Sequence, residues 1–237
     1  MNSTFKKLLI SGALMAAIAP MGCKSSDKSA SAHGGQMSAG GHKETAADVK
    51  FETSQDPPFR AQTRFAAGQL AETQGETNRA IEQYWAAIKL DPKCKEAYYR
   101  LGVVYCELKH YPDAVVAWKQ YLKITGGDPM GYSNLGFCYE LSGQHREAEE
   151  NFRKGIEKDP KNNACRVNYG LMLIRDSRVN EGIIQLQAVL SEAEVHYNLA
   201  SVFEHTGQKE QARAEYRRAI DLDPNMVDAE VRLSAMR

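Results

Sequence analysis

The sequence of 237 residues predicts an all-α fold in which pairs of helices stack in a row, because three residue columns recur along it. The first column is small, and its members are 34, 34, 34 and 30 residues apart: Gly68, Gly102, Gly136, Gly170 and Ala200. Twelve residues after each member comes another small residue: Ala80, Ala114, Ala148, Gly182 and Ala212. Sixteen residues after each member comes a bulky one: Tyr84, Trp118, Phe152, Leu186 and Tyr216. A fixed period of this length indicates an array of supersecondary units.

Each unit is expected to hold two helices joined by a tight turn. An isolated glycine inside a helix costs about 1 kcal/mol relative to alanine, so the first column indicates places where two helices cross closely. Gly75, Gly143 and Gly207 suit the turns inside units one, three and five. The expected pairs lie near 60–73 and 77–91, 95–108 and 111–125, 129–141 and 145–158, 163–175 and 179–191, and 193–205 and 209–222.

The ends of the units follow from proline and glycine. Asp-Pro pairs at 91–92, 159–160 and 223–224 end the second helices of units one, three and five. Proline disfavours the α conformation in the residue before it and has no N–H to donate. In unit two Gly126 and Gly127 supply the break, and unit four has no closing proline and is four residues shorter, between Val189 and Ala193.

The last segment, 226–237, is expected to be a capping helix. Its Val227, Val231 and Leu233 are predicted to cover the end of the core, while Glu230 and Arg232 face water. The terminal unit of a stacked array needs such a polar outer face to stay soluble.

The pattern resembles the tetratricopeptide repeat. Unit three carries the signature throughout, as Tyr132-x-x-Leu135-Gly136-x-x-Tyr139, then Ala148-x-x-x-Phe152, then Pro160. The resemblance implies a right-handed α-solenoid over 59–225, with about five helix–turn–helix repeats at 61–94, 95–128, 129–162, 163–192 and 193–226. Unit four departs most from it, since Gly182 replaces the alanine and Leu186 the aromatic residue.

Residues 1–22 are interpreted as a signal peptide of the lipoprotein type. Lys6 and Lys7 precede an apolar run, Leu8 to Ala19, that is shorter than the roughly 20 residues of a membrane-spanning helix. Gly22-Cys23 resembles a bacterial lipobox, which implies that Cys23 is the lipid-modified first residue of the mature chain. Cleavage after Ala19, giving a secreted protein, and a retained signal anchor are the alternatives.

Residues 23–58 are expected to be the lipidated cysteine and a disordered linker. This stretch is rich in Ser, Gly and Lys and has few bulky apolar residues, so it buries too little surface to offset its chain entropy. His33 and His42 lie in it, but a disordered spacing offers no fixed metal geometry.

Charge and cysteine content exclude several classes of function. The chain balances 30 basic against 30 acidic residues, which argues against a nucleic-acid binder. Cys94, Cys106, Cys138 and Cys165 form no Cys-x-x-Cys pair, which argues against zinc and thioredoxin-like sites. Cys106 and Cys138 are the one pair considered for a disulfide, and small packing residues are the alternative. We therefore expect no enzyme, no cofactor and no metal site.

The resemblance implies a concave groove lined by the first helices of successive units. Carried over by their spacing from the glycine column, its residues are Phe65, Gln69, Tyr99, Arg100, Val103, Asn134, Phe137, Asn168, Leu171, Tyr197 and Asn198. Asn134, Asn168 and Asn198 resemble an asparagine ladder that binds a peptide backbone, but asparagines there also suit inter-unit contacts or a solvated surface. Arg100 suits a carboxylate. The apolar members are predicted to face a partner, because other columns already fill the core.

Together these features predict a non-enzymatic scaffold that binds a partner protein or peptide. The protein is expected to be a membrane-anchored lipoprotein facing the periplasm, and Lys24 after Cys23 favours the outer membrane. The expected role is envelope assembly or complex recruitment. A self-associating structural protein and a redox or enzymatic factor using the cysteines are the alternatives.

Overall fold

The structure is a computed structural model that describes residues 60–236. The signal peptide, Cys23 and the linker that the sequence predicts lie outside the described residues.

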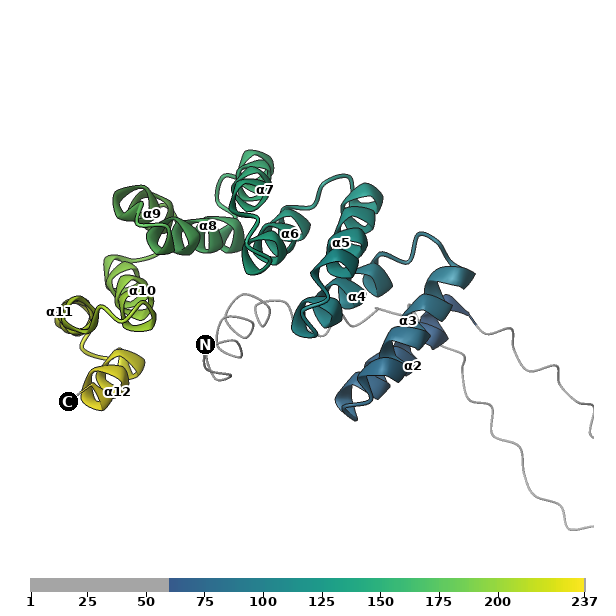
Figure 1. Cartoon of the computed structure of the whole chain (residues 1–237), viewed down its shortest axis with the longest axis horizontal. Helices are drawn as coiled ribbons and strands as arrows, with labels where there is room; N and C mark the ends of the chain where they lie inside the picture. The colour runs from purple at the N-terminus through teal and green to yellow at the C-terminus, as the bar shows by residue number, and fades with distance from the viewer. Residues whose placement is uncertain (1–59, 237) are drawn as a thin grey trace, which may run out of the picture. The chain divides into compact units, whose positions relative to one another are not determined.

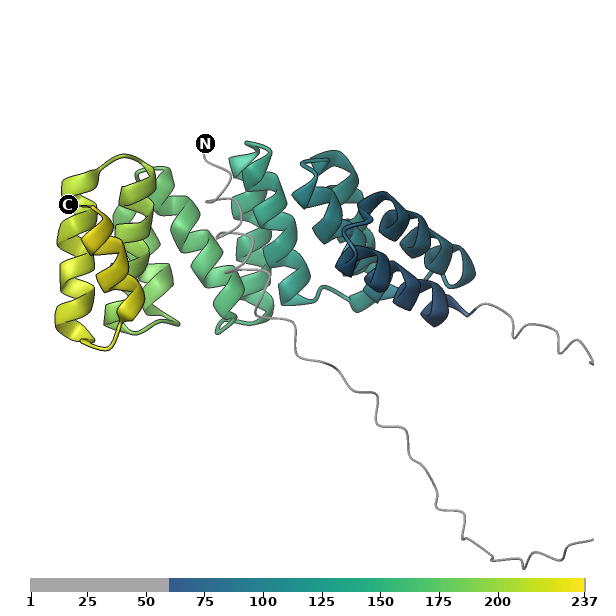
Figure 2. The ribbon, with the colours of Figure 1, turned by 90° about the horizontal axis from the view of Figure 1, so that it is seen from below.

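The described residues form eleven α-helices, α2 to α12, and no strand. Five pairs follow one another in a row, and a single helix ends the row (Figure 1 and Figure 2). The pairs are α2 (Ala61–Thr73) and α3 (Thr77–Leu90), α4 (Lys95–Glu107) and α5 (Tyr111–Thr125), α6 (Pro129–Leu141) and α7 (His145–Lys158), α8 (Asn163–Arg175) and α9 (Val179–Gln187), and α10 (Glu192–His205) and α11 (Lys209–Leu222); α12 is Val227–Ala235. The predicted α-solenoid is confirmed.

Each pair packs internally and against its neighbours. The second helix of a pair contacts the first helix of the next pair. For example, α3 contacts α4, and α5 contacts α6. In the second half of the array the first helices also contact one another, α6 with α8 and α8 with α10. These additional contacts decide how much of the first-helix surface stays accessible.

The predicted glycine column lies where the two helices of a pair cross. A Cβ atom on Gly136 would lie 2.7 Å from Cε1 of Phe152, and one on Gly170 would lie 2.9 Å from Cδ2 of Leu186. Each glycine thus faces the bulky residue sixteen positions later. The bulky column is fully buried, at 0–1% exposure: Tyr84, Trp118, Phe152, Leu186 and Tyr216. These contacts form the core of each unit.

The turns inside the pairs need one residue in the left-handed region. Gly75, Gly143 and Gly207 adopt it with φ between 76° and 82°, as their positions predict. In units two and four the same role falls to Lys109 (φ 61°) and Ser177 (φ 65°), which give no glycine signal in the sequence. Residues other than glycine rarely adopt this backbone conformation, because their Cβ atom crowds the backbone.

The second helix of unit four is shorter than the sequence predicts. It ends at Gln187 and not near residue 191. The next helix begins with a capping box at Ser191, whose Oγ accepts from the Glu194 N–H while the Glu194 carboxylate accepts from the Ser191 N–H. This capping box starts α10 soon after α9 ends. The four residues that unit four lacks are therefore missing from the end of α9 and from the turn after it.

Of the three residues predicted to cover the end of the core, only Leu233 does so. Ala229 is buried, and Leu233, one turn later, packs on the last core cluster together with Met226 and Met236. Val227 and Val231 remain 64% and 59% exposed, so the prediction that they cover the core is wrong. Residues two apart on a helix point to nearly opposite sides, which places both valines away from the Ala229 face.

The glycine column yields a stability prediction. In Gly136→Ala the added methyl would meet the buried Phe152 ring, and this overpacking outweighs the helix propensity that alanine gains. We expect the free energy of unfolding to fall by about 1–2 kcal/mol, measured by urea unfolding with circular dichroism. In a Phe152→Leu background the same substitution should cost less, because the smaller side chain leaves room. Equal costs in the two backgrounds would contradict the contact.

Candidate functional site

The groove residues predicted from the sequence fall into two groups in the structure. Seven are exposed or half-buried and line the accessible first-helix surface: Phe65, Gln69, Tyr99, Arg100, Leu171, Tyr197 and Asn198. Four lie in the packed interior with 1–6% exposure: Val103, Asn134, Phe137 and Asn168. The buried group comes from α4, α6 and α8, in the middle of the array. The accessible surface is therefore narrower at its centre than the sequence predicts.

The accessible aromatic rings lean on the bulky column of their own unit. Phe65 lies 5.6 Å from the Tyr84 ring, and Tyr197 lies 5.7 Å from the Tyr216 ring. Tyr99 packs edge-on against Trp118 at 5.1 Å. Burial raises the pKa of the Tyr99 phenol, so it stays neutral. These ring contacts hold the half-buried rings of Phe65, Tyr99 and Tyr197 against the core of their own units.

The three asparagines have three different environments. Asn168 Nδ2 donates to Ser133 Oγ at 3.0 Å, which links α8 to α6. Asn198 Nδ2 donates to the Glu194 carbonyl of its own helix at 2.8 Å. Asn134 Nδ2 is buried and satisfies no hydrogen-bond geometry among the described residues, although the amide lies close enough to the Tyr99 phenol to oppose the rise in its pKa. Of the three, Asn134 alone keeps an amide donor without an acceptor in this part of the chain.

Arg100 already has a carboxylate partner within the chain. Its Nη2 and Nε donate to the two Glu72 oxygens at 2.6 and 2.9 Å, and the Tyr84 hydroxyl donates to the same carboxylate. Burial lowers the pKa of Arg100, but the hydrogen bonds and charge of Glu72 outweigh it and raise the pKa. The carboxylate expected from a ligand is thus supplied by α2.

A second ion pair of this kind joins α6 to α8. Arg175 Nε donates to Glu140 Oε1 at 2.9 Å. Burial raises the pKa of Glu140, although Arg175 lies beside it. Both Arg100 and Arg175 are thus paired with a glutamate of the preceding first helix.

Cys94, Cys106, Cys138 and Cys165 are free thiols, so the disulfide considered for Cys106 and Cys138 is not formed. Burial raises the pKa of Cys165 to about 12, and its Sγ lies 3.2 Å from the Pro129 carbonyl. A hydrogen bond with Cys106, then burial, raises the pKa of Cys138. Because the thiolate is the reactive form, these groups do not supply an activated nucleophile at neutral pH. Across residues 60–236 no group of three His, Cys, Asp or Glu side chains is placed to hold a metal ion.

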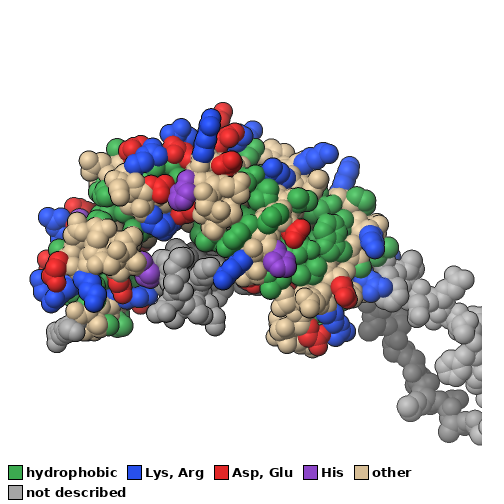
Figure 3. All heavy atoms as spheres, viewed as in Figure 1, with side chains coloured by type: hydrophobic (Ala, Val, Ile, Leu, Met, Phe, Trp, Pro, Cys, Tyr) green, Lys and Arg blue, Asp and Glu red, His purple; other side chains and the backbone are tan. Residues whose placement is uncertain are grey.

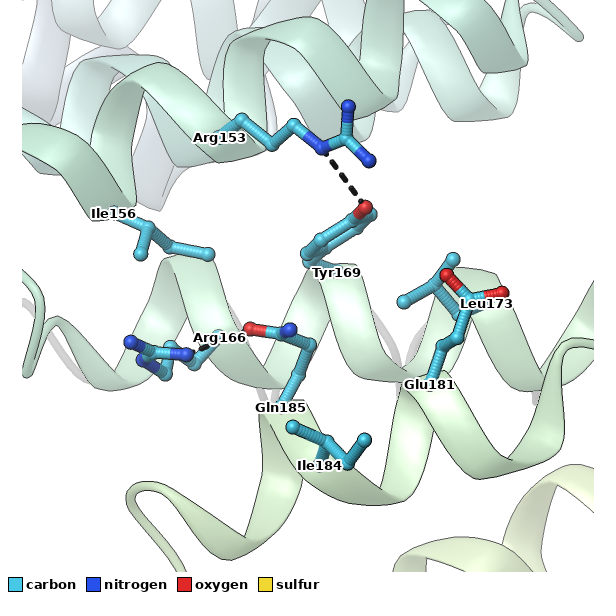
Figure 4. Close-up of a pocket in the computed structure, with 8 residues that line it drawn as sticks. All are labelled: Arg153, Ile156, Arg166, Tyr169, Leu173, Glu181, Ile184 and Gln185. Carbon is cyan, nitrogen blue, oxygen red and sulfur yellow. Dashed lines mark hydrogen bonds between the residues drawn. The ribbon is translucent and has the colours of Figure 1, made fainter.

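A pocket of about 350 Å³ lies between α7, α8 and α9, away from the predicted groove residues (Figure 4). Tyr169 and Leu173 of α8 are almost fully buried there, and Ile156 and Ile184 add apolar surface from α7 and α9. The polar lining residues are Arg153, Arg166, Glu181 and Gln185.

Sequence reasoning missed this pocket, although one signal for it was present. The residue before the glycine column is Ala or Leu in four units but Tyr169 in the fourth. Its phenol reaches outward, accepting from Arg153 Nε at 3.1 Å and donating to Glu149 Oε1 at 2.8 Å.

Charged side chains are concentrated around this pocket. The α7 helix carries eight charged residues in fourteen, while α5 carries three in fifteen. In Figure 3 blue and red side chains gather over α7, whereas green ones gather over α4 and α5. Glu149 is at the centre of the charged cluster, since Arg178 Nη1 and Arg153 Nη2 contact it at 2.8 and 2.5 Å. The hydrogen bond from Arg178 holds its pKa below the usual range.

Comparison with known families matches the repeats directly. A family model described as TPR repeat matches residues 73–109. Three described as tetratricopeptide repeat match residues 96–124, 129–162 and 193–226. Together these matches cover about half of the chain.

The curated relatives share only part of their length with this chain. It is 31% identical over 103 residues to small glutamine-rich tetratricopeptide repeat-containing protein 2 of Mycosarcoma maydis, covering 44% of this chain and 29% of the relative. It is 26% identical over 155 residues to human tetratricopeptide repeat protein 6, covering 63% and 30%. The chain thus spans less than a third of these relatives.

Solved structures share the fold at low identity. YrrB, described as a TPR protein with an unusual peptide-binding site, superposes with a TM-score of 0.52 at 23% identity, covering 71% of this chain and 89% of YrrB. TTC0263, a TPR protein of Thermus thermophilus, superposes with a TM-score of 0.53 at 21% identity, covering 74% and 98%. The MamA protein gives a TM-score of 0.57 at 17% identity, covering 71% and 94%.

The lowered pKa of Glu149 predicts a loss of stability in acid. A carboxyl group whose pKa is lower in the folded than in the unfolded chain stabilises the fold above its unfolded pKa, and this contribution is lost as pH falls through the folded pKa. We expect Glu149→Gln to lower the free energy of unfolding by about 1 kcal/mol near neutral pH and by much less at about pH 3. Urea unfolding at both pH values measures this. An equal loss at both would show that the charge of Glu149 contributes nothing.

Proposed function

Because the chain belongs to the tetratricopeptide repeat family, we propose that it is a scaffold for protein–protein interaction whose first-helix surface holds a partner protein or peptide. The family and the fold support the coarse role of an interaction module. The finer elements of the proposal are the binding surface, the membrane anchor and the envelope role.

The observation that carries the proposed surface is a set of half-buried side chains that already have fixed positions. Phe65, Tyr99 and Tyr197 are held by their own unit's core, and Leu171 lies between them along the array. A partner that covers them orders few additional rotamers, which lowers the entropic cost of association. Large amphipathic rings of this kind are enriched among residues that dominate binding energy.

The electrostatics of the surface favour an uncharged contact. Arg100 and Arg175 are each paired with a glutamate of a neighbouring first helix. An anionic partner group would have to displace a glutamate from its arginine, and a cationic one would have to displace an arginine; either leaves a charge unpaired, which is costly. Backbone amides and apolar side chains suit the surface better.

The proposed location rests on the leader alone. Lys6, Lys7, the apolar run to Ala19 and Gly22-Cys23 support export, lipidation of Cys23 and anchoring in the periplasmic face of a bacterial membrane, with the outer membrane favoured by Lys24. Within residues 60–236 no helix is both long and apolar enough to cross a bilayer. Recruitment of a partner to the envelope is the proposed role.

Bulk added to the first-helix surface tests the binding proposal. Ala66 and Gln69 are exposed on α2, one turn apart. We expect Ala66→Trp with Gln69→Trp to reduce partner recovery by about tenfold, because the added rings occupy the space of the partner next to Phe65. The measurement is quantitative mass spectrometry of proteins crosslinked to the full chain in bacterial envelopes.

A matched control lies on α11, where Gln211 and Ala214 are the same residue types at the same spacing and are also exposed. Gln211→Trp with Ala214→Trp should leave recovery unchanged. If every captured protein responds alike to the two variants, the first-helix surface is not the binding site.

Replacement of Cys23 tests the anchor. The sulfur atom of Cys23 is the acyl acceptor in the proposal, so Cys23→Ala should release the protein from the membrane fraction or leave its leader uncleaved. Membrane fractionation and intact mass of the purified chain measure this, and Cys94→Ala serves as a control. A wild-type chain whose mass shows no acyl group would rule out lipidation.

A further inference from the structure

We propose that the pocket between α7, α8 and α9 is a second binding site, which takes the C-terminal aromatic residue of a peptide. It is built largely from second helices and shares no residue with the first-helix surface proposed above. Its role is therefore independent of that surface.

The equivalent position two repeats earlier in the chain shows which kind of side chain fills it. Subtracting two repeat periods, 68 residues, maps the pocket onto the space between α3, α4 and α5: Arg153 maps onto Trp85, Arg166 onto Tyr98 and Leu173 onto Tyr105. There the Trp85 ring lies edge-on to the Tyr98 ring at 6.4 Å, and its Nε1 donates to the Tyr105 hydroxyl at 3.1 Å. An indole ring from the chain thus packs at this position in the first half of the array.

In the pocket the equivalent residue does not pack in this way. Arg153 is turned towards Tyr169 and Glu149, as Figure 4 shows for its contact with the Tyr169 hydroxyl. Ile184 on the opposite side is 62% exposed, and Leu173 below is buried. The place that the Trp85 ring occupies against α4 is therefore left, against α8, to a ring from outside.

The charge of the pocket specifies the rest of the ligand. Arg153 and Arg178 are paired with Glu149 and Glu181. The Arg166 guanidinium donates only to neutral oxygens, at 2.7 Å each, from Nε to the Pro160 carbonyl and from Nη1 to Gln185 Oε1. Among the described residues no carboxylate pairs with it, so the lining keeps one uncompensated positive charge.

Comparison of the same two positions in unit five explains why a carboxylate is expected. His196 and Glu215 stand where unit four has Arg166 and Gln185, and His196 Nδ1 lies 2.5 Å from Glu215 Oε2. Unit five supplies its own carboxylate, whereas unit four supplies a neutral amide. An arginine at the edge of a pocket that also offers apolar surface favours a bidentate carboxylate ligand.

The small size of the pocket favours a C-terminal residue as the ligand that supplies both the aromatic ring and the carboxylate. A pocket of about 350 Å³ is near the lower limit of ligand pockets. It holds one residue, and a C-terminal residue brings its ring and its free carboxylate together. The ring is placed against Leu173 and Ile184, and the carboxylate against Arg166.

The test uses N-acetyl-L-tryptophan as the probe and the full chain, observed by ¹⁵N-edited NMR. We expect saturable shifts of amide signals in α8 and α9, and an affinity about tenfold weaker for N-acetyl-L-tryptophan amide, which lacks the charge. Arg166→Gln should weaken binding of the acid by about tenfold. Arg64→Gln is the matched control, because Arg64 Nη1 donates to Gln83 Oε1 in the same way in unit one.

Three outcomes would overturn the proposal: no saturable binding, equal affinity for the acid and its amide, or a full response of Arg166→Gln that Arg64→Gln shares. Ile184→Trp gives a second test if Arg166→Gln fails to fold, since it adds bulk at an exposed position and should abolish binding. Acetyl-Asp-Trp-amide binding as tightly as the acid would show that an internal carboxylate suffices, against a terminal residue. The Ala66→Trp, Gln69→Trp variant should still bind the probe, so failure of this proposal can be told apart from failure of the proposed first-helix surface.

Discussion

The structure depends on the close crossing of two helices at the small-residue column. Because Gly136 has no side chain, the Phe152 ring packs 2.7 Å from the place of a Cβ atom, and a similarly close contact recurs at the other glycines of the column. Because the ring then fills the centre of its unit, the unit has a core of its own and a fixed angle between its helices. Neighbouring units stack on these rigid pairs, which is how a short local pattern extends along the whole array.

The columns, the turns at glycine and the order of the helices were predictable, because each depends on residues within one period. The accessibility of the first-helix surface was not. Asn168 and Phe137 have the spacing of groove residues, but both are buried in the part of the array where α8 contacts α6 and α10. The distance between first helices is a property of the stack, and the repeat pattern in the sequence does not encode it. The turns at Lys109 and Ser177 could not be predicted from the sequence for another reason, because they adopt the left-handed conformation without a glycine.

The polar residues of the units compensate for one another in ways that the hydrophobic columns do not reveal. Tyr84 and Tyr216 are buried phenols, and each donates to a glutamate of its partner helix, Glu72 and Glu204. Trp118 occupies the same column, but its Nε1 is buried without an acceptor among the described residues. A donor that loses water without gaining a partner destabilises the fold, so in unit two the apolar packing of the indole ring has to offset this cost.

The shortened α9 has a consequence for how the array unfolds. Stability in a linear array is close to a sum over neighbouring interfaces, and the weakest interface opens first. With nine residues α9 covers less of α8 and α10 than the other second helices cover of their neighbours. The loop from 188 to 191 is thus the site where the array is expected to open first, and cleavage there by a protease would separate four units from a C-terminal block of α10, α11 and α12.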